Sequence, residues 1–473
     1  MTDSNTFRTE KDSMGEFEVP SEAYYGANTM RAIVNFPISN LLFPSPFIQA
    51  IANVKLCAAQ VNTKLNLLDK KLSEAIIQAA EEIANGSFHN QFLVDIFQTG
   101  SGTSTNMNAN EVISNRAIEI LGGELGSRIP VHPNDHVNMG QSSNDVIPTS
   151  IHIAANVEIT HTLVPSLIEL RNSLTEKSVE FIDVIKTGRT HLQDATPIRL
   201  GQEFLGYAGQ IQNAIERLEH AKSELSEVAL GGTAVGTGVN THPEFAKEVC
   251  KLLSEKLNIN IAETSNHFQA QSSLDSIVET SGVLKTIAVS LMKISNDIRW
   301  LGSGPRAGIG EISLPEVQPG SSIMPGKVNP VIPESVCMAA AQVIGNDTTI
   351  SIGGQSGNFE INVMMPICAF NLLQSIELLS TSSLNLSNQC ISGLKATDAG
   401  PNMVERGLAI VTTLVPYIGY DEAASIAKEA QETGQTIKEV SLIRTKIPSD
   451  ELDKILDATS MTEPGSGDGI SIG

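Results

Sequence analysis

The chain has 473 residues and a formal net charge of −22, since 53 acidic residues outnumber 31 lysines and arginines. This length is ample for a large core and allows roughly two to four domains. The charge argues against a nucleic-acid or anionic-membrane partner, because such partners need a basic face that neutralises phosphates. With 41% hydrophobic but only 4% aromatic residues, the interior should consist of aliphatic seams, which favours helices packed on helices.

The five cysteines are scattered and show no C-x-x-C spacing. This pattern supports neither a disulfide framework nor a cysteine-rich zinc or iron–sulfur site, and it indicates buried, reduced thiols in a cytoplasmic protein. The N-terminal stretch MTDSNTFRTEKDSMGEFEVP has no apolar core and mixes acids among its basic residues, so we expect no signal or transit peptide. No uncharged apolar stretch reaches the about twenty residues of a membrane-spanning helix.

The first clear helical pattern lies between Asp69 and Gly86. Its apolar residues recur at the helical period, at Leu72, Ile76, Ala79 and Ile83. Aspartate is a residue type that caps helix N-termini, and glycine is one that ends helices in the left-handed conformation. We therefore predict a helix of about three turns here.

Three longer apolar patterns follow, in residues 202–230, 274–298 and 361–394. The seam of the first is formed by Phe204, Ala208, Ile211, Ile215, Leu218 and Leu225, and that of the second by Leu274, Ile277, Leu284, Leu291 and Ile298. Helices of about 25 residues are roughly twice the usual length and bury their stripes best against one another in a bundle. Strands alternating with helices are not evident, so a doubly wound α/β sheet is disfavoured.

Segments rich in glycine, serine and asparagine separate these helices, and loops on a rigid scaffold are where binding groups concentrate. The segments are residues 99–110, 132–144, 188–197, 231–240 and 302–329.

Soft boundaries near Gly140 and Gly393 divide the chain into three predicted domains. Residues 1–140 form a mixed, largely helical N-terminal domain, and residues 141–393 form a central long-helix domain. Residues 394–473 form a small helical C-terminal domain.

The segment GSSIMPGKVNP, residues 320–330, first suggests a phosphate-binding loop. A P-loop needs four residues between its first glycine and Gly-Lys, and Ser or Thr after the lysine. Here five residues separate Gly320 from Gly326, Val328 follows the lysine, and no strand precedes the segment, so a nucleotide site is rejected. What remains is a flexible loop with two serines, a lysine and an asparagine, and a plain surface turn is the alternative.

Two other segments carry groups that bind anions. Residues 99–110 offer Ser101, Thr103, Thr105 and Asn106 beside glycine amides, although hydroxyls before a helix more often cap it. Residues 132–144 contain His132, Asn134, Asp135, Ser142, Ser143 and Asn144. Zinc binding by His132, Asp135 and His136 is disfavoured, because we expect no helical i, i+4 histidine pair and asparagine is a poor zinc ligand.

His191 lies beside Thr190 in a segment too irregular for a core helix. A lone histidine is usually structural, and it gains catalytic value when an acid such as Glu334 holds it protonated or oriented. The segments GGTAVGTG and RWLGSGPRAGIGEI lack dinucleotide-binding spacing, which indicates no redox cofactor.

Together these motifs resemble the fumarase/aspartase superfamily over essentially the whole chain, and specifically its class II fumarase branch. TGSGTSTNMNANE, HPND, QSSND, GRTHLQDATP, GGTAVGTG, GSSIMPGKVNP and PYIGYDEA occur in the order expected of that family. Aspartate ammonia-lyases of the superfamily typically have alanine at the position of Gly326 and glutamine at that of His191. Met139-Gly140 stands where many fumarases have Lys-Ser, and NPVIPE after Lys327 is similar to aspartases as well, so aspartate ammonia-lyase is the alternative.

The resemblance implies a mainly α fold built on a long-helix bundle, with three domains per chain and a homotetramer whose central helices form a shared core. Each active site would be made by three subunits, bind a small dicarboxylate and need no metal or organic cofactor. The implied reaction is the reversible anti elimination of water from (S)-malate to fumarate, a step of the tricarboxylic acid cycle. A catalytically silent helical scaffold is a remote alternative, since lyases of this superfamily have been reused as structural proteins.

By resemblance, Ser321 is the base that removes the C3 proton, and His191, oriented by Glu334, is the acid that protonates the departing hydroxyl. Lys327 and Asn329 would stabilise the aci-carboxylate dianion formed between these steps. The implied substrate-binding residues are Ser101, Gly102, Thr103, Ser142, Ser143, Asn144, Thr190, Ser322, Val328 and Asn329. A second dicarboxylate site would be formed by His132, Asn134 and Asp135.

Overall fold

The computed structural model describes residues 7–465, so the N-terminal stretch expected to lack a targeting segment lies partly outside the described residues. The chain divides into two compact units, each made of three segments. Unit 1 comprises the chain up to Ser166 with Ala214–Val289 and Ala339–Thr381, and unit 2 comprises Leu167–Asn213, Ser290–Met338 and the chain from Ser382 onward. The three-domain division at Gly140 and Gly393 stays a prediction.

Helices dominate the described chain. They are α1 Ala27–Asn35, α2 Ser45–Lys64, α3 Lys70–Ala84, α4 Thr103–Ile120, α5 Ser143–Glu158, α6 Val164–Glu180, α7 Leu200–Leu225, α8 Phe245–Leu257, α9 His267–Ser272, α10 Asp275–Leu301, α11 Val331–Gly354, α12 Met365–Gln389, α13 Ala399–Val404, α14 Val415–Ile418, α15 Tyr420–Thr433, α16 Ile437–Arg444 and α17 Ser449–Ile455. The predicted mainly α fold is therefore confirmed.

The strands are short and occur only in pairs among the described residues. They are β1 Phe7–Asp12, β2 Gly15–Pro20, β3 Ile185–Thr190, β4 Gln193–Arg199, β5 Glu227–Val228, β6 Ala262–Glu263, β7 Ile312–Ser313, β8 Gly357–Asn358, β9 Ile361–Asn362 and β10 Lys395–Ala396. The pairs β1–β2, β3–β4, β7–β10 and β8–β9 are antiparallel, and β5–β6 is parallel. A doubly wound sheet is absent from this part of the chain, as predicted, but the β3–β4 hairpin was not foreseen.

Helix α3 confirms the prediction between Asp69 and Gly86. The Asp69 carboxylate accepts the backbone N–H groups of Lys71 (2.9 Å) and Leu72 (3.2 Å) at its start. At its end Gly86 has a φ of 95° and donates to the carbonyl of Ile83 (2.9 Å). The side-chain cap and the left-handed glycine satisfy backbone groups that the helix itself leaves unpaired.

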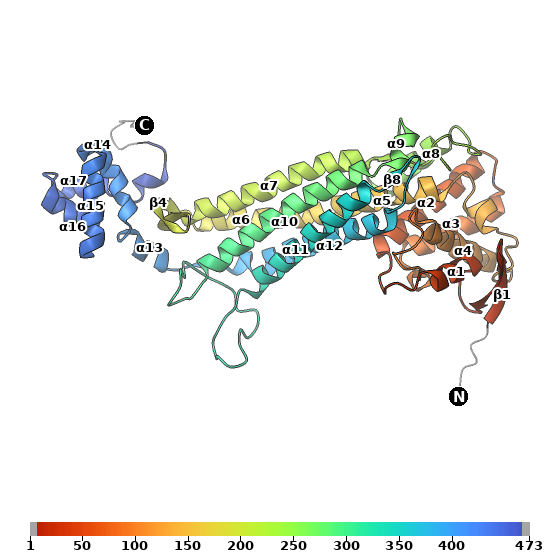
Figure 1. Cartoon of the computed structure of the whole chain (residues 1–473), viewed down its shortest axis with the longest axis horizontal. Coiled ribbons are helices and arrows are strands. Elements are labelled where there is room, and N and C mark those ends of the chain that lie inside the picture. The colour runs from red at the N-terminus through yellow and green to blue at the C-terminus, as the bar shows by residue number, and fades with distance from the viewer. Residues whose placement is uncertain (1–6, 466–473) are drawn as a thin grey trace. The chain divides into compact units, whose positions relative to one another are not determined.

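In unit 1, α2 packs against α3, α5 and α8, and α4 packs against α1 and α3 (Figure 1). Ile51, Val54 and Val61 of α2 are fully buried. Burial of each such side chain stabilises the folded chain by roughly 1.5–3 kcal/mol. Residues 99–110, expected to form a loop, are helical from Thr103 onward. That expectation was wrong because α4 begins at this residue and buries one face against its neighbours.

Helices α7, α10 and α12 have 25 to 27 residues, which confirms the predicted long helices. Helix α11, with 24 residues, was not predicted. All seam residues predicted for the first two are buried. Helix α7 ends at Leu225 rather than Leu230, because the chain turns into β5, which pairs with β6. Helix α12 begins at Met365, so Pro366 lies in its first turn, where a missing N–H leaves no hydrogen bond unmade.

Polar side chains link the long helices inside each unit. In unit 1, Ser281 of α10 donates to Asp347 of α11 over 2.8 Å. In unit 2, Tyr207 of α7 donates to Asp297 of α10 over 3.0 Å. Because polar groups in a helix interface need partners, such pairs favour one register of the packed helices over others.

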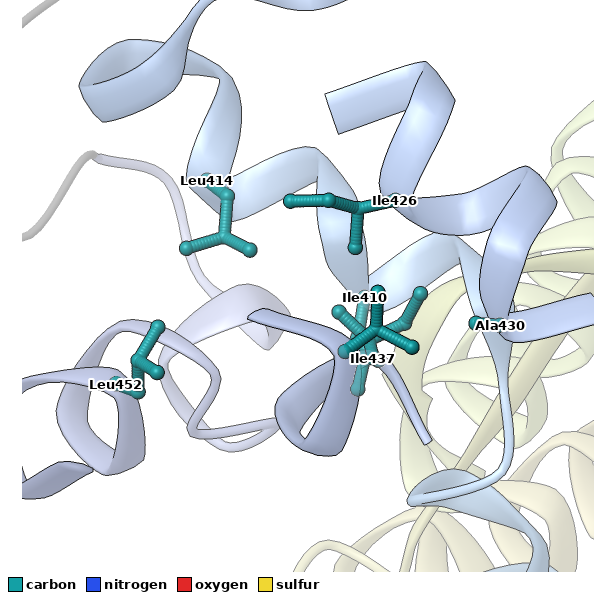
Figure 2. Close-up of a cluster of buried hydrophobic side chains, with 7 residues drawn as sticks. Ile410, Leu414, Ile426, Ala430, Ile437 and Leu452 are labelled. Carbon is teal, nitrogen blue, oxygen red and sulfur yellow. The ribbon is translucent and has the colours of Figure 1, made fainter. Parts of the chain in front are cut away.

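The C-terminal part of unit 2 has its own hydrophobic cluster, which Figure 2 shows in close-up. It consists of Ile410, Leu414, Ile426, Ala430, Ile437, Val440 and Leu452. These residues come from a 3₁₀ segment, Leu408–Leu414, and from α15, α16 and α17. Helices as short as these depend on such tertiary packing for their stability.

The five cysteines are free thiols, and four of them, Cys57, Cys250, Cys368 and Cys390, are buried. Burial raises the pKa of each of these four thiols to about 12. None of the described helices combines the length and apolar character needed to cross a bilayer.

Candidate active site

Three hydroxyl groups form a chain in unit 1. Ser101 and Thr103 share a hydrogen bond of 2.8 Å, and Thr103 donates to Ser143 over 2.9 Å. Thr103 is the first residue of α4 and Ser143 the first of α5, and these two helices are in contact. Helix N-termini carry unpaired N–H groups and partial positive charge, so hydroxyls that meet at two of them suit a carboxylate ligand.

The turn before α4 depends on two glycines. Gly102 has a φ of 72°, and its N–H donates to the carbonyl of Thr99 over 2.7 Å. A Cβ on Gly100 would lie 1.9 Å from the carbonyl oxygen of Val363. Only glycine lets this turn approach the segment before α12, and the close approach fixes the position of Ser101.

Ser142 is the N-cap residue of α5. Its Oγ accepts the N–H of Asn144 (3.3 Å), and its own N–H donates to the carboxylate of Asp145 (2.9 Å), which forms a capping box. The carboxamide of Asn144 donates to the carbonyl of Ala234 over 2.8 Å. The structure thus brings the predicted binding residues of the two segments, 101–103 and 142–144, together in unit 1.

His132 caps a single π-helical turn, Pro133–Val137. Its Nδ1 accepts the backbone N–H groups of Asn134 (3.3 Å) and Asp135 (3.2 Å), so in the neutral ring the proton lies on Nε2. The Asp135 carboxylate is 3.4 Å from the same Nδ1. Asn134 and Asp135 are exposed, and the second dicarboxylate site stays a prediction.

Contrary to the sequence expectation, His132 and His136 do stand four residues apart across this turn. The turn uses both rings, because Nδ1 of His136 accepts the N–H of His132 over 2.8 Å. Burial lowers the pKa of His136. Within residues 7–465, no group of three or more His, Cys, Asp or Glu side chains is arranged to hold a metal ion.

Thr190 and His191 lie at the tip of the β3–β4 hairpin in unit 2. Thr190 pairs with Gln193 across the strands, and His191 and Leu192 form the two-residue turn with φ values of 57° and 60°. Two left-handed residues define the turn type whose twist matches a β-hairpin, although residues other than glycine adopt it at a cost. Both Thr190 and His191 are exposed, so the turn presents the histidine outward.

A buried ionic cluster holds this hairpin. Lys186 of β3 donates to Glu203 over 2.8 Å and lies 3.0 Å from Glu311. Arg189 of the same strand donates to Glu311 over 2.8 Å. The side chains of Lys186 and Glu311 are only 1% and 3% exposed, and pairing two cations with two carboxylates offsets the cost of removing these charges from water.

Ser321 lies in a loop of unit 2 that lines a cavity of about 420 Å³. Its Oγ accepts the backbone N–H groups of Ile323 (3.2 Å) and Met324 (3.0 Å). Two backbone donors aimed at one hydroxyl oxygen favour its alkoxide form. Lys327 and Ser322 of the same loop are exposed.

Gly320 and Gly326 shape this loop in different ways. A Cβ on Gly320 would lie 1.9 Å from the carbonyl oxygen of Lys327, and the Asn329 carboxamide donates to the Gly320 carbonyl. The two ends of the loop therefore meet at Gly320. Gly326 has a φ of 79° and open space around it. Glycine is therefore favoured at this position by the left-handed backbone conformation and not by a lack of space.

Glu334 lies in the first turn of α11 and is half-buried. The structure gives no hydrogen bond or ion pair between His191 and Glu334, which both lie within the described residues. Their pairing stays a prediction, as do the catalytic roles of Ser321, Lys327 and Asn329 and the binding role of Val328.

Sequence reasoning did not identify three residues that support the candidate site residues: Asp145, Lys55 and Glu311. The spacing of Ser142 and Asp145 matches a capping box, and this signal could have identified Asp145. Lys55 occurs inside an apolar helical run and Glu311 inside a glycine-rich segment. No local pattern distinguishes either residue from a surface charge.

Comparison with protein families places the chain in a class. Residues 15–345 match the family described as Lyase, and residues 410–463 match the one described as Fumarase C C-terminus. The first match alone spans well over half of the chain. The chain belongs to this lyase family.

Similar proteins narrow the class. The chain is 50% identical over 459 residues to fumarate hydratase class II 2 of Bradyrhizobium diazoefficiens, with 97% of each chain covered. It is 48% identical to the mitochondrial fumarate hydratase of Homo sapiens, covering 98% of this chain and 91% of that one. The crystal structure of recombinant class II fumarase from Schistosoma mansoni matches with a TM-score of 0.94 at 39% identity, covering 96% and 99% of the two chains. The chain therefore belongs to the branch of the class II fumarate hydratases, and the predicted mainly α fold of this family is confirmed.

Proposed function

We propose that this chain catalyses the reversible hydration of fumarate to (S)-malate, as a hydro-lyase of the tricarboxylic acid cycle. The observation that carries the proposal is identity of about half of all residues with class II fumarate hydratases along nearly the full chain. His191 and Gly326 support it, because aspartate ammonia-lyases typically have other residues at these two positions.

In the dehydration direction, Ser321 as its alkoxide takes the C3 proton of malate. The electron pair left at C3 spreads into the adjacent carboxylate, and Lys327 and Asn329 stabilise the resulting aci-carboxylate dianion. The N–H groups of Ile323 and Met324 support this assignment, since both already donate to the Ser321 oxygen. Lowering the cost of the alkoxide is what a serine base requires.

His191 then donates a proton to the C2 hydroxyl. The C2–O bond breaks as the C2=C3 double bond forms, and water leaves. Base and acid act from opposite faces of the substrate, which gives anti elimination. Glu334 orients His191, and the hairpin held by Glu311 supplies a rigid support for the ring.

The substrate carboxylates bind to Ser101, Thr103, Ser142, Ser143 and Asn144. The hydroxyl chain at the N-termini of α4 and α5 supports this role. Additional contacts come from Gly102, Thr190, Ser322 and Val328. The turn with His132, Asn134 and Asp135 forms a separate dicarboxylate site.

The working form is a cytoplasmic homotetramer of three-domain chains, in which three subunits build each active site. Exposed apolar side chains on the long helices support this assembly: Leu205, Val289, Trp300, Met338, Ile352 and Leu384. A partner subunit that covers such residues removes their apolar surface from water.

The decisive experiment follows the ultraviolet absorbance of fumarate with purified protein and (S)-malate, and in parallel with aspartate. We expect fumarate to form from malate and not from aspartate. A His191→Asn protein purified in the same way controls for contamination by the host's own fumarase. Fumarate from aspartate alone would identify an ammonia-lyase, and no fumarate from either substrate would identify a silent scaffold.

A further inference from the structure

One peptide group next to the proposed carboxylate site is held at both ends. This is the peptide bond between Gln141 and Ser142. Its N–H donates to the Asp145 carboxylate over 2.9 Å. Its carbonyl, on Gln141, accepts from the carboxamide of Asn138 over 3.1 Å, and the oxygen of that carboxamide accepts from the Lys55 ammonium over 2.7 Å. A lysine and an aspartate therefore reach the same peptide from its two sides.

Asp145 also ties this peptide to a second segment. Its other carboxylate oxygen accepts the backbone N–H groups of Gly231 (3.1 Å) and Thr233 (2.9 Å). The next residue along that segment, Ala234, accepts the carboxamide of Asn144. One carboxylate thus fixes the backbone before α5 and the segment against which the Asn144 side chain rests.

Both charged side chains are completely buried, since Lys55 and Asp145 are each 0% exposed. Removing two charges from water is costly, and apolar residues of similar volume are often as stable as a buried charged pair or more so. Burial raises the pKa of Asp145 to about 6 and lowers that of Lys55 to about 7. Stability alone therefore does not account for a buried lysine and aspartate at this place.

We propose that Lys55 and Asp145 are positioning residues, which hold the Ser142 hydroxyl and the Asn144 carboxamide where a substrate carboxylate binds. The inference rests on the proposed function. Neither side chain touches the substrate. They act through the Gln141–Ser142 peptide, whose rotation would displace the hydroxyl from its bonding position. A displacement of about 1 Å in a site of this kind can cost about 10²-fold in rate.

The test compares Asp145→Asn and Lys55→Met with the matched control Glu111→Gln. Glu111 is also a buried carboxylate of unit 1, 3% exposed, and it accepts three backbone N–H groups, those of Gly26, Asn28 and Thr29. Asp145→Asn and Glu111→Gln should both lower the thermal unfolding midpoint, because each removes a buried carboxylate that accepts backbone N–H groups. Only the two positioning variants should raise KM for malate, by about tenfold or more, with a smaller fall in kcat.

Succinate binding measured by calorimetry gives a second readout that needs no turnover, and it should weaken in parallel with the rise in KM. If Asp145→Asn does not fold, Lys55→Met decides the question, because methionine fills a similar volume without a charge. An active wild type with an unchanged KM in the positioning variants would overturn the inference. A wild type without activity on malate would overturn the proposed function, and succinate binding would then test the positioning role by itself.

Discussion

Arg189 lies two residues before His191, and its guanidinium donates to the carboxylate of Glu311 over 2.8 Å. The same carboxylate pairs with Lys186, so one buried acid serves two cations of strand β3. The position of the proposed catalytic acid therefore depends on an ion pair as well as on strand pairing.

Glu311→Gln should leave these two cations with one carboxylate fewer. We expect the free energy of unfolding to fall by roughly 3 kcal/mol, and kcat to fall more than KM rises, because His191 loses its support. Urea unfolding and steady-state kinetics measure the two effects. Glu74→Gln is the control, since its pair with Lys70 is 3.8 Å long and exposed and should contribute little. Equal losses in both variants would contradict the prediction.

Ser321→Ala should abolish most turnover, because the variant lacks the oxygen that takes the C3 proton. The expected loss in kcat is about 10²- to 10⁴-fold. Succinate binding should stay within about threefold of wild type, since the ground-state dicarboxylate is held mainly by other groups. Wild-type kcat in the alanine variant would show that another residue is the base.

Gly320→Ala should impair the loop, since its new Cβ would lie 1.9 Å from the Lys327 carbonyl oxygen. We expect a fall in kcat of about tenfold or more with little change in the unfolding midpoint, because the loop lies outside the helical core. Gly326→Asn is the matched control, as asparagine tolerates a positive φ and this position has open space. A larger defect in Gly326→Asn than in Gly320→Ala would contradict this account of the loop.

Subunit mixing tests the proposed shared active site. His191→Asn and Ser321→Ala proteins should each be inactive, but mixed after reversible dissociation they should regain activity. If the two residues reach a site from different subunits, random assembly of equal amounts restores about a quarter of the sites. No recovery, with mixed tetramers demonstrated by mass spectrometry, would show that both residues come from one chain.

Lys55 should give stability a distinctive pH dependence. Its pKa is lowered by burial from 10.5 to about 7, so between these values the unfolded chain binds more protons than the folded one. The free energy of unfolding of the wild type should therefore rise with pH relative to Lys55→Met, by up to about 1.4 kcal/mol per pH unit. Denaturant unfolding from pH 8 to about 10 measures this, and Lys64→Met, which removes an exposed lysine, should show no such trend.

Local sequence patterns predicted the parts of the molecule that local forces determine. The cap at Asp69, the glycine stop at Gly86 and the long apolar seams all correspond to observed helices. The β3–β4 hairpin was missed because its turn, His191 and Leu192, contains no glycine or asparagine to mark a left-handed conformation.

The supports of the candidate site could not be predicted because they join distant parts of the chain. Arg189 and Glu311 are 122 positions apart, and Asp145 reaches Thr233 across 88 positions. A single sequence identifies residues that match a family motif, such as Ser321, but not the charges that hold those residues in place.

The buried thiols have a chemical consequence for an enzyme that handles fumarate. Fumarate is an electron-poor alkene, and thiolates add to such double bonds. With a pKa of about 12, a thiol is ionised in only about one molecule in a hundred thousand at neutral pH. Cys57, Cys250, Cys368 and Cys390 are therefore protected twice from alkylation by the enzyme's own product, by their low thiolate fraction and by their lack of access to solvent.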